Sequence, residues 1–205
     1  MLLTLEGIDF CGKSTQARLL VERLEKERTV QFIREPGGTR ISERLREILL
    51  DTRHRELTDI TELFLFSASR AQLVAEVIRP ALDRGEFVVC DRFFDSTTAY
   101  QGFGRGIDRD AIAAINALAT GGTIPGLTVV IDIPVEEIER RKHGAGMQFD
   151  RMETSGQQFY ARVRSGYQEM ARSSERFVMI DGTRSVQDIH QEIWRTLVLR
   201  QIVHS

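Results

Sequence analysis

The sequence has few of the residues that mark specialised classes of protein. Its 205 residues include two cysteines, four prolines and one tryptophan. Two cysteines, at positions 11 and 90, form no disulfide framework and lack metal-ligand spacing, which excludes disulfide-stapled secreted scaffolds and zinc modules. We therefore expect a reducing compartment and a cytoplasmic location.

Strong net charge and long apolar runs are also missing. The 28 Lys and Arg residues nearly balance the 30 Asp and Glu residues, giving a net charge of −2. Without a basic excess, the chain is not expected to bind a nucleic acid polymer. No apolar run approaches the roughly 18 residues that suggest a membrane span, and the N-terminus has no secretory pattern, so no membrane association is expected.

Short apolar runs alternate with stretches of helical spacing. Such runs are typical of strands buried in a parallel sheet, and the stretches between them of crossover helices. The predicted strands are residues 2–5, 30–33, 87–90, 128–133 and 177–180. The predicted helices are residues 13–26, 41–50, 59–84, 108–119, 135–142, 153–172 and 186–199. We expect one domain, a three-layer α/β/α fold with a five-stranded parallel sheet.

Residues 7–14, Gly-Ile-Asp-Phe-Cys-Gly-Lys-Ser, have the pattern of a phosphate-binding P-loop. They follow the first predicted strand and open the first predicted helix, as this motif requires. The glycines let backbone N–H groups turn toward phosphate oxygens, and the helix N-terminus adds a positive dipole end. Lys13 is expected to reach the β and γ phosphates of ATP, and the Ser14 hydroxyl to bind Mg²⁺. The fold class is therefore that of a P-loop NTPase.

Asp91 and Arg92 directly follow the third predicted strand. The carboxyl ends of parallel strands are where such sheets present their ligand sites. Asp91 suits the water shell of Mg²⁺, and the planar fork of Arg92 suits a bridge between donor and acceptor phosphates. An ordinary surface Asp–Arg pair is the alternative explanation.

Two further motifs fit a ligand site but also have plain structural explanations. Residues 34–39, Arg-Glu-Pro-Gly-Gly-Thr, allow close backbone approach to a ligand, although a tight turn explains them nearly as well. Phe66 and Arg70 lie one turn apart on the predicted helix 59–84, so a ring and a guanidinium point the same way. They suit stacking on a base and bonding to its edge; core packing of the ring is the alternative.

Residues 143–149, His-Gly-Ala-Gly-Met-Gln-Phe, do not fit a packed element. They follow Arg140, Arg141 and Lys142 and precede Asp150 and Arg151. Glycines between cations are what a lid over a polyphosphate requires, although a solvated loop explains them equally well. We expect a helical lid segment at about residues 140–153, within a single kinase domain covering residues 1–205.

Five motifs in order resemble those of the thymidylate kinase family. They are residues 6–15, 34–39, 65–70, 91–101 and 149–153, and together they span nearly the whole chain. The resemblance implies a nucleoside monophosphate kinase that transfers the γ-phosphoryl group of ATP to dTMP, uses Mg²⁺ and forms a homodimer. The alternative is a P-loop kinase for another nucleotide or a deoxynucleoside. A GTPase-like switch would need a guanine-reading Asn-Lys-x-Asp segment, which the sequence lacks.

The resemblance also implies a role for each matching residue. ATP would be held by the P-loop residues Gly7, Ile8, Asp9, Phe10, Cys11, Gly12, Lys13, Ser14 and Thr15, and by Arg140 at the lid base. Mg²⁺ would be held by Ser14 and Asp91. The acceptor would contact Asp9, Glu35, Pro36, Phe66, Arg70, Arg92, Ser96, Thr97, Tyr100 and Gln101. The catalytic residues would be Lys13, Arg92, Arg151 and Asp9.

The P-loop departs from the common form of the family at Phe10 and Cys11, where small residues are usual. One branch of the family supplies a catalytic arginine from this loop, and neither residue can do so. The hypothesis is that Arg151, with Arg141 as a second candidate, supplies that charge from the lid segment.

Overall fold

The computed structural model describes residues 1–145, 150–153 and 156–203, with the backbone alone for residues 143–145. Five strands form one parallel sheet in the order β2-β3-β1-β4-β5. They are β1 (Leu2–Glu6), β2 (Val30–Arg34), β3 (Phe87–Asp91), β4 (Leu127–Asp132) and β5 (Phe177–Asp181). The predicted fold class is confirmed, and each strand lies within about one residue of its predicted position.

The burial of each strand follows its place in the sheet. All residues of β1 and β3 are buried, as are all but the last of β4, whereas the edge strands β2 and β5 each have two exposed residues. Central parallel strands are covered by helices on both faces, which explains their continuous apolar runs.

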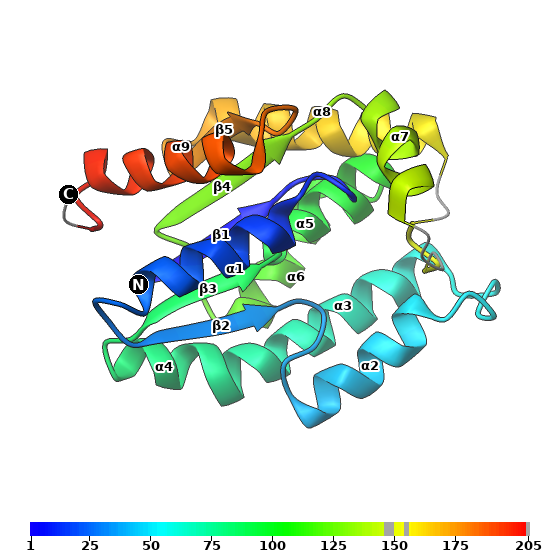
Figure 1. Ribbon diagram of the computed structural model, residues 1–205. Coiled ribbons are helices and arrows are strands. Elements are labelled where there is room, and N and C mark those ends of the chain that lie inside the picture. Colours follow the sequence, from blue (N-terminus) through cyan, green and yellow to red (C-terminus); the bar gives the residue numbers. More distant parts are fainter. Residues whose placement is uncertain (146–149, 154–155, 204–205) are drawn as a thin grey trace.

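Helices cover both faces of the sheet. One face carries α1 (Lys13–Leu24) and α9 (Val186–Leu199), and α1 packs on β1, β2 and β3 (Figure 1). The other face carries α3 (Asp59–Leu73) and α4 (Arg79–Asp83), together with α6 (Arg109–Thr120) and α8 (Gln157–Ser173). The strands point toward α2 (Arg40–Leu50) and α7 (Glu136–Ala145), and both termini lie at the opposite end of the molecule.

The predicted helix 59–84 is interrupted by a π-helical turn, η1 (Val74–Ile78). The sequence carries no signal for this turn, because a π-bulge changes the hydrogen-bond spacing without changing the residue types. Gly85 follows α4 with a positive φ of 76°, as expected for a glycine that ends a helix.

A helical segment that the sequence analysis missed follows β3. It consists of α5 (Phe94–Thr97) and the π-helical η2 (Thr98–Gly104). Its two glycines resemble turn residues, which is why it was missed. Gly104 allows close packing against α8, because a Cβ there would lie 2.6 Å from the Phe159 ring, and a Cβ at Gly166 of α8 would lie 2.6 Å from the Phe103 ring. Each helix thus places a glycine opposite an aromatic ring of the other.

The expectation that residues 143–149 lie outside any packed element is wrong at its start. Helix α7 continues through Ala145 and includes Gly144, since a single glycine weakens a helix without necessarily ending it. Residues 146–149 lie outside the described residues, so that part of the predicted lid stays a prediction.

Candidate functional site

A cavity lies at the carboxyl ends of the central strands. Its walls come from the P-loop, the loop after β2, helices α2 and α3, the end of β3, the segments α5 and η2, and residues 150–153. It brings together thirteen predicted site residues: Asp9, Lys13, Ser14, Glu35, Pro36, Phe66, Arg70, Asp91, Arg92, Ser96, Thr97, Tyr100 and Gln101.

The P-loop has the backbone shape that a phosphate cradle needs. Gly7 has a φ of 138°, and a Cβ there would lie 2.5 Å from the Ile131 carbonyl oxygen, so only glycine fits. Gly12 adopts a left-handed conformation at the start of α1. Lys13 Nζ lies 3.9 Å from Asp9 Oδ1 and donates to the Ile8 carbonyl at 3.4 Å. The loop is therefore folded as a P-loop, with its lysine at the cavity.

Phe10 occupies a position in this loop that disfavours a side chain. Its φ is 63°, in the left-handed region that favours glycine. Its ring packs against the main hydrophobic core, and its carbonyl accepts a hydrogen bond of 2.9 Å from Arg141 on α7. Arg141 also donates to the Gly182 carbonyl at 2.7 Å. Arg141 therefore joins the P-loop to the loop after β5.

Ser14 and Asp91 meet at the end of β3. Ser14 Oγ donates to Asp91 Oδ2 at 2.5 Å, whereas Asp91 Oδ1 is buried without a hydrogen-bond partner among the described residues. A hydroxyl beside a carboxylate with a free oxygen fits Mg²⁺, which takes few protein ligands and completes its shell with waters and phosphates. In the described ranges no three His, Cys, Asp or Glu side chains are placed so that together they could hold a metal ion, so a cage made only of these ligands is not present there.

Asp9 and Arg92 form the centre of a buried polar network. Arg92 Nη2 lies 2.5 Å from Asp9 Oδ1, and the Asp9 Oδ2 accepts from Tyr100 at 3.1 Å and from Tyr160 at 3.0 Å. Arg92 also donates to the Gly7 carbonyl and to Ser96, each at 3.0 Å. Burial raises the pKa of Asp9, but the charges of Arg92 and Lys13 outweigh burial and hold this pKa below its ordinary value.

Glu6 lies behind this network and is fully buried. Its carboxylate accepts from the Phe93 amide at 2.7 Å, from Ser96 at 2.6 Å and from Tyr167 at 2.8 Å. Burial, followed by the nearby charge of Asp95, raises the pKa of Glu6 to about 7.

The opposite end of the cavity is lined by Phe66, Arg70 and Gln101. Arg70 is buried and donates from Nε and Nη2 to both oxygens of Glu35 at 2.7 to 3.1 Å. Its Nη1 donates to Asn116 at 3.3 Å. The predicted pairing of ring and guanidinium on one helix face is present, and Glu35 fixes the plane of the guanidinium.

Several cavity residues had no site role assigned from the sequence. They are Arg34, Arg46, Leu50, Asp150, Met152 and Glu153. Arg34 and Arg46 both donate to the Pro36 carbonyl, at 3.1 and 2.9 Å, so two guanidiniums meet at this loop. Arg34 stands in a motif that was noticed, whereas Arg46 looked like any exposed cation of an amphipathic helix. Only the fold shows that Arg46 contacts the loop after β2.

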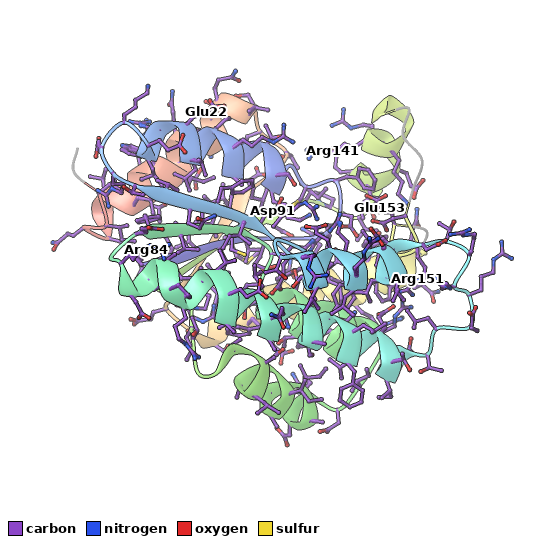
Figure 2. The ribbon with its side chains drawn as sticks, turned by 90° about the horizontal axis from the view of Figure 1, so that it is seen from below. Glu22, Arg84, Asp91, Arg141, Arg151 and Glu153 are labelled. Atoms are coloured by element: carbon purple, nitrogen blue, oxygen red, sulfur yellow. The ribbon has the colours of Figure 1, made fainter. Side chains whose placement is uncertain are left out.

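Two predicted residues of the lid segment do not line the cavity. Arg140 is 70% exposed at its side chain and pairs with Glu137 on the same helix. Arg151 lies 2.6 Å from Glu62 and donates to the Leu49 carbonyl at 2.8 Å. Figure 2 shows Arg151, Glu153 and Arg141 to one side of Asp91. The remaining predicted residues, Gly7, Ile8, Phe10, Cys11, Gly12 and Thr15, belong to the P-loop itself but are not part of the cavity wall.

The chain is similar to known proteins over nearly its whole length. The family model described as Thymidylate kinase matches residues 5–193. The thymidylate kinase of Chlorobium luteolum is 48% identical over 207 residues, covering 96% of each chain. That of Geotalea uraniireducens is 44% identical, covering 97% of this chain and 96% of the relative.

A solved structure agrees with these matches. The thymidylate kinase of Ehrlichia chaffeensis superposes with a TM-score of 0.80 at 33% identity, covering 96% of this chain and 98% of that one. The family match, these relatives and the shared fold confirm the resemblance carried by the five motifs: the chain belongs to the thymidylate kinase family.

Proposed function

We propose that the chain transfers the γ-phosphoryl group of ATP to dTMP, giving dTDP and ADP. This proposal rests on the family match over residues 5–193 and on a cavity that is lined both by the P-loop and by the Phe66 ring and the Arg70 guanidinium. The rival, a P-loop kinase for another nucleotide or a deoxynucleoside, has no observation in its favour.

The P-loop end of the cavity would hold the donor. The amides of residues 7–15 and Lys13 would surround the ATP phosphates, and Ser14 and Asp91 would hold Mg²⁺ through the hydroxyl and the free carboxylate oxygen. The bound ion would supply positive charge that neutralises the phosphates. Arg140, which is exposed on α7, would cover the adenine.

The other end would hold the acceptor. Phe66 would stack on thymine, with Arg70, Thr97 and Gln101 at its edges and Tyr100 against the deoxyribose. Glu35, Pro36 and Ser96 would complete this half, with Asp9 and Arg92 between the two phosphates. The guanidiniums of Arg34 and Arg46 would add to the charge that holds the acceptor phosphate.

A phosphate acceptor needs no general base. The second pKa of a phosphate monoester is near 6, so its oxygen is already largely deprotonated at neutral pH. Catalysis then consists of holding two anionic groups in line while cations neutralise the charge of the transferring group. Lys13 and Arg92 would do so from the cavity, and Asp9 would fix the position of both cations.

Arg151 is proposed as the lid cation of the transition state. In the structure it is paired with Glu62, so this role requires the arginine to exchange that partner for the phosphoryl group. Arg141 remains the second candidate, because its bond to the Phe10 carbonyl already brings it to the P-loop.

An acceptor panel tests the proposed function. ADP release with ATP and Mg²⁺ is to be followed for dTMP, dUMP, UMP, dCMP, AMP, GMP and thymidine. We expect a strong preference for dTMP and no activity after chelation of Mg²⁺. Preference for a purine nucleotide or for thymidine would refute the acceptor assignment, and full activity with chelator would refute the role given to Ser14 and Asp91.

We also propose a homodimer. On α3, Ile60 and Phe64 are 51% and 56% exposed, and Leu118 of the adjoining α6 is 85% exposed. Ala68 and Ala71 extend the exposed stripe at helical spacing. Sedimentation should give a dimer that Phe64→Glu dissociates, whereas Leu199→Glu, at an 83% exposed site on α9, leaves it intact. A monomeric wild-type protein would refute the proposal.

The proposed location is the cytoplasm, which contains the donor ATP. Free thiols such as those of Cys11 and Cys90 stay reduced there. No helix in the described part of the chain is long and apolar enough to cross a membrane.

A further inference from the structure

Glu62 is a buried carboxylate next to the cavity but outside its wall. It lies on α3 with 1% of its surface exposed. It accepts from Gln101 Nε2 at 2.8 Å and from Arg105 at 3.2 Å, and it pairs with Arg151 at 2.6 Å. Burial raises the pKa of Glu62, but the hydrogen bond and charge of Arg105, with further help from Gln101 and Arg151, hold it below its ordinary value. Glu62 is therefore ionised at neutral pH.

The charge state of Glu62 decides which way the Gln101 amide faces. An ionised carboxylate only accepts hydrogen bonds, whereas an amide has a donating NH₂ and an accepting oxygen that a flip exchanges. The NH₂ must therefore face Glu62. The other end of the amide, Oε1, accepts no hydrogen bond from the described residues, and Gln101 lines the cavity. The amide thus presents an acceptor to a bound ligand.

Arg70 presents donors to the same end of the cavity. Of its five N–H groups, Nε–H, one on Nη2 and one on Nη1 are engaged by Glu35 and Asn116. The other two have no acceptor among the described residues, and Arg70 lines the cavity beside Gln101. An acceptor next to a donor is complementary to the imide edge of thymine and uracil, where a ring N–H adjoins a carbonyl. Cytosine has a ring nitrogen acceptor next to an amino donor, so it is mismatched at both atoms.

We propose that Glu62 is a specificity-determining positioning residue, which fixes the Gln101 amide so that the site accepts imide-edged pyrimidine monophosphates and rejects cytosine ones. The inference rests on the proposed dTMP site and deepens it, because it assigns the rejection of cytosine to a residue that touches no substrate. A site built to hydrogen-bond its ligand rejects a mismatched analogue strongly, since buried groups are then left unpaired.

The test is the ratio of kcat/KM for dTMP to that for dCMP, compared between the wild-type enzyme and Glu62→Gln. A neutral amide at position 62 can pair with the Gln101 amide in either orientation, so the ratio should fall about tenfold or more. The ratio of dTMP to dUMP should not change, because both bases have the same imide edge. Asp59→Asn, which neutralises an exposed carboxylate on the same helix and keeps the Glu62–Gln101 and Glu62–Arg105 contacts, should leave both ratios within about twofold.

Gln101→Leu separates this inference from the proposed function. If the wild-type enzyme does not prefer dTMP to dCMP, or if Gln101→Leu leaves the ratio unchanged, the proposed acceptor site is wrong. If Gln101→Leu lowers the ratio while folded Glu62→Gln does not, the inference alone is overturned. In the double variant, Glu62→Gln should add nothing to the effect of Gln101→Leu.

If Glu62→Gln does not fold, a measurement on the wild-type protein tests the orientation of the Gln101 amide. Neutron diffraction of a dTMP complex locates the hydrogens of the Gln101 amide directly. Hydrogens on the side of Glu62 would support the inference, and hydrogens facing the base would overturn it.

Discussion

Arg92 Nη2 lies 2.5 Å from Asp9 Oδ1, and it is held there from a backbone with a φ of 72°. Arg92, which directly follows β3, thus folds back onto Asp9 in the P-loop. A left-handed conformation is costly for a residue with a side chain and persists only where the surroundings fix it. Here the guanidinium donates to four acceptors, which fix both its position and its plane. They are the Gly7 carbonyl, Asp9, Ser96 and the Tyr100 hydroxyl.

Replacing Arg92 by lysine should lower kcat/KM for dTMP by about 10²-fold, because one ammonium cannot bond Gly7, Asp9, Ser96 and Tyr100 together. Steady-state kinetics check this. Arg84→Lys, in an exposed pair with Glu86 far from the cavity, is the matched control and should change little. A loss below twofold for Arg92→Lys would contradict the assigned role.

Arg151→Ala should lower kcat by roughly 10³-fold with little change in the KM for dTMP, if Arg151 acts in the transition state. Arg105→Ala removes another cation from Glu62 and is the control for a merely structural effect. Rapid-quench measurement of the chemical step in both variants distinguishes a transition-state role from a structural effect. Equal losses in both variants would assign Arg151 to the ion pair alone.

The buried Glu6 should make stability fall with rising pH. Its folded-state pKa of about 7 lies above the ordinary value of 4.5, so the native state binds the extra proton. The contribution of this group to the free energy of unfolding is complete below pH 4.5 and is lost as the pH rises through 7. The loss approaches about 3 kcal/mol above pH 7.

Glu6→Gln should remove that dependence, since the amide oxygen accepts from Phe93 and its NH₂ donates to Ser96 or Tyr167. Denaturant unfolding of both proteins between pH 5 and 8 gives the difference, and the variant should gain relative to wild type as the pH rises. Glu169→Gln, at an exposed carboxylate, is the control. A constant difference across this range would contradict the prediction.

Two variants at Phe10 should separate the effect of losing the ring from the effect of the left-handed backbone on stability. Phe10→Ala loses the ring and keeps the unfavourable φ, whereas Phe10→Gly loses the ring and relieves it. We expect Phe10→Gly to be more stable than Phe10→Ala by about 1 kcal/mol in denaturant unfolding. Equal stabilities would mean that the loop relaxes when the ring is removed.

The sequence predicted what depends on local chemistry. The P-loop, the strand that ends at Asp91 and the pairing of Phe66 with Arg70 all follow from residue types at fixed spacing. Arg46 and Glu62 could not be predicted, because their importance comes from neighbours distant in the chain, Pro36 in one case and Gln101 in the other. The π-helical η2 was missed because its glycines resemble turn residues in the sequence, although Gly104 serves close contact with Phe159.

The strand order has a consequence for synthesis on the ribosome. The first two strands made, β1 and β2, do not pair with each other, and β3 lies between them. A nascent chain that ends before residue 87 therefore has the whole P-loop but no sheet to hold it. Domains form as their segments emerge, so competence to bind nucleotide should arise abruptly once β3 joins the two earlier strands.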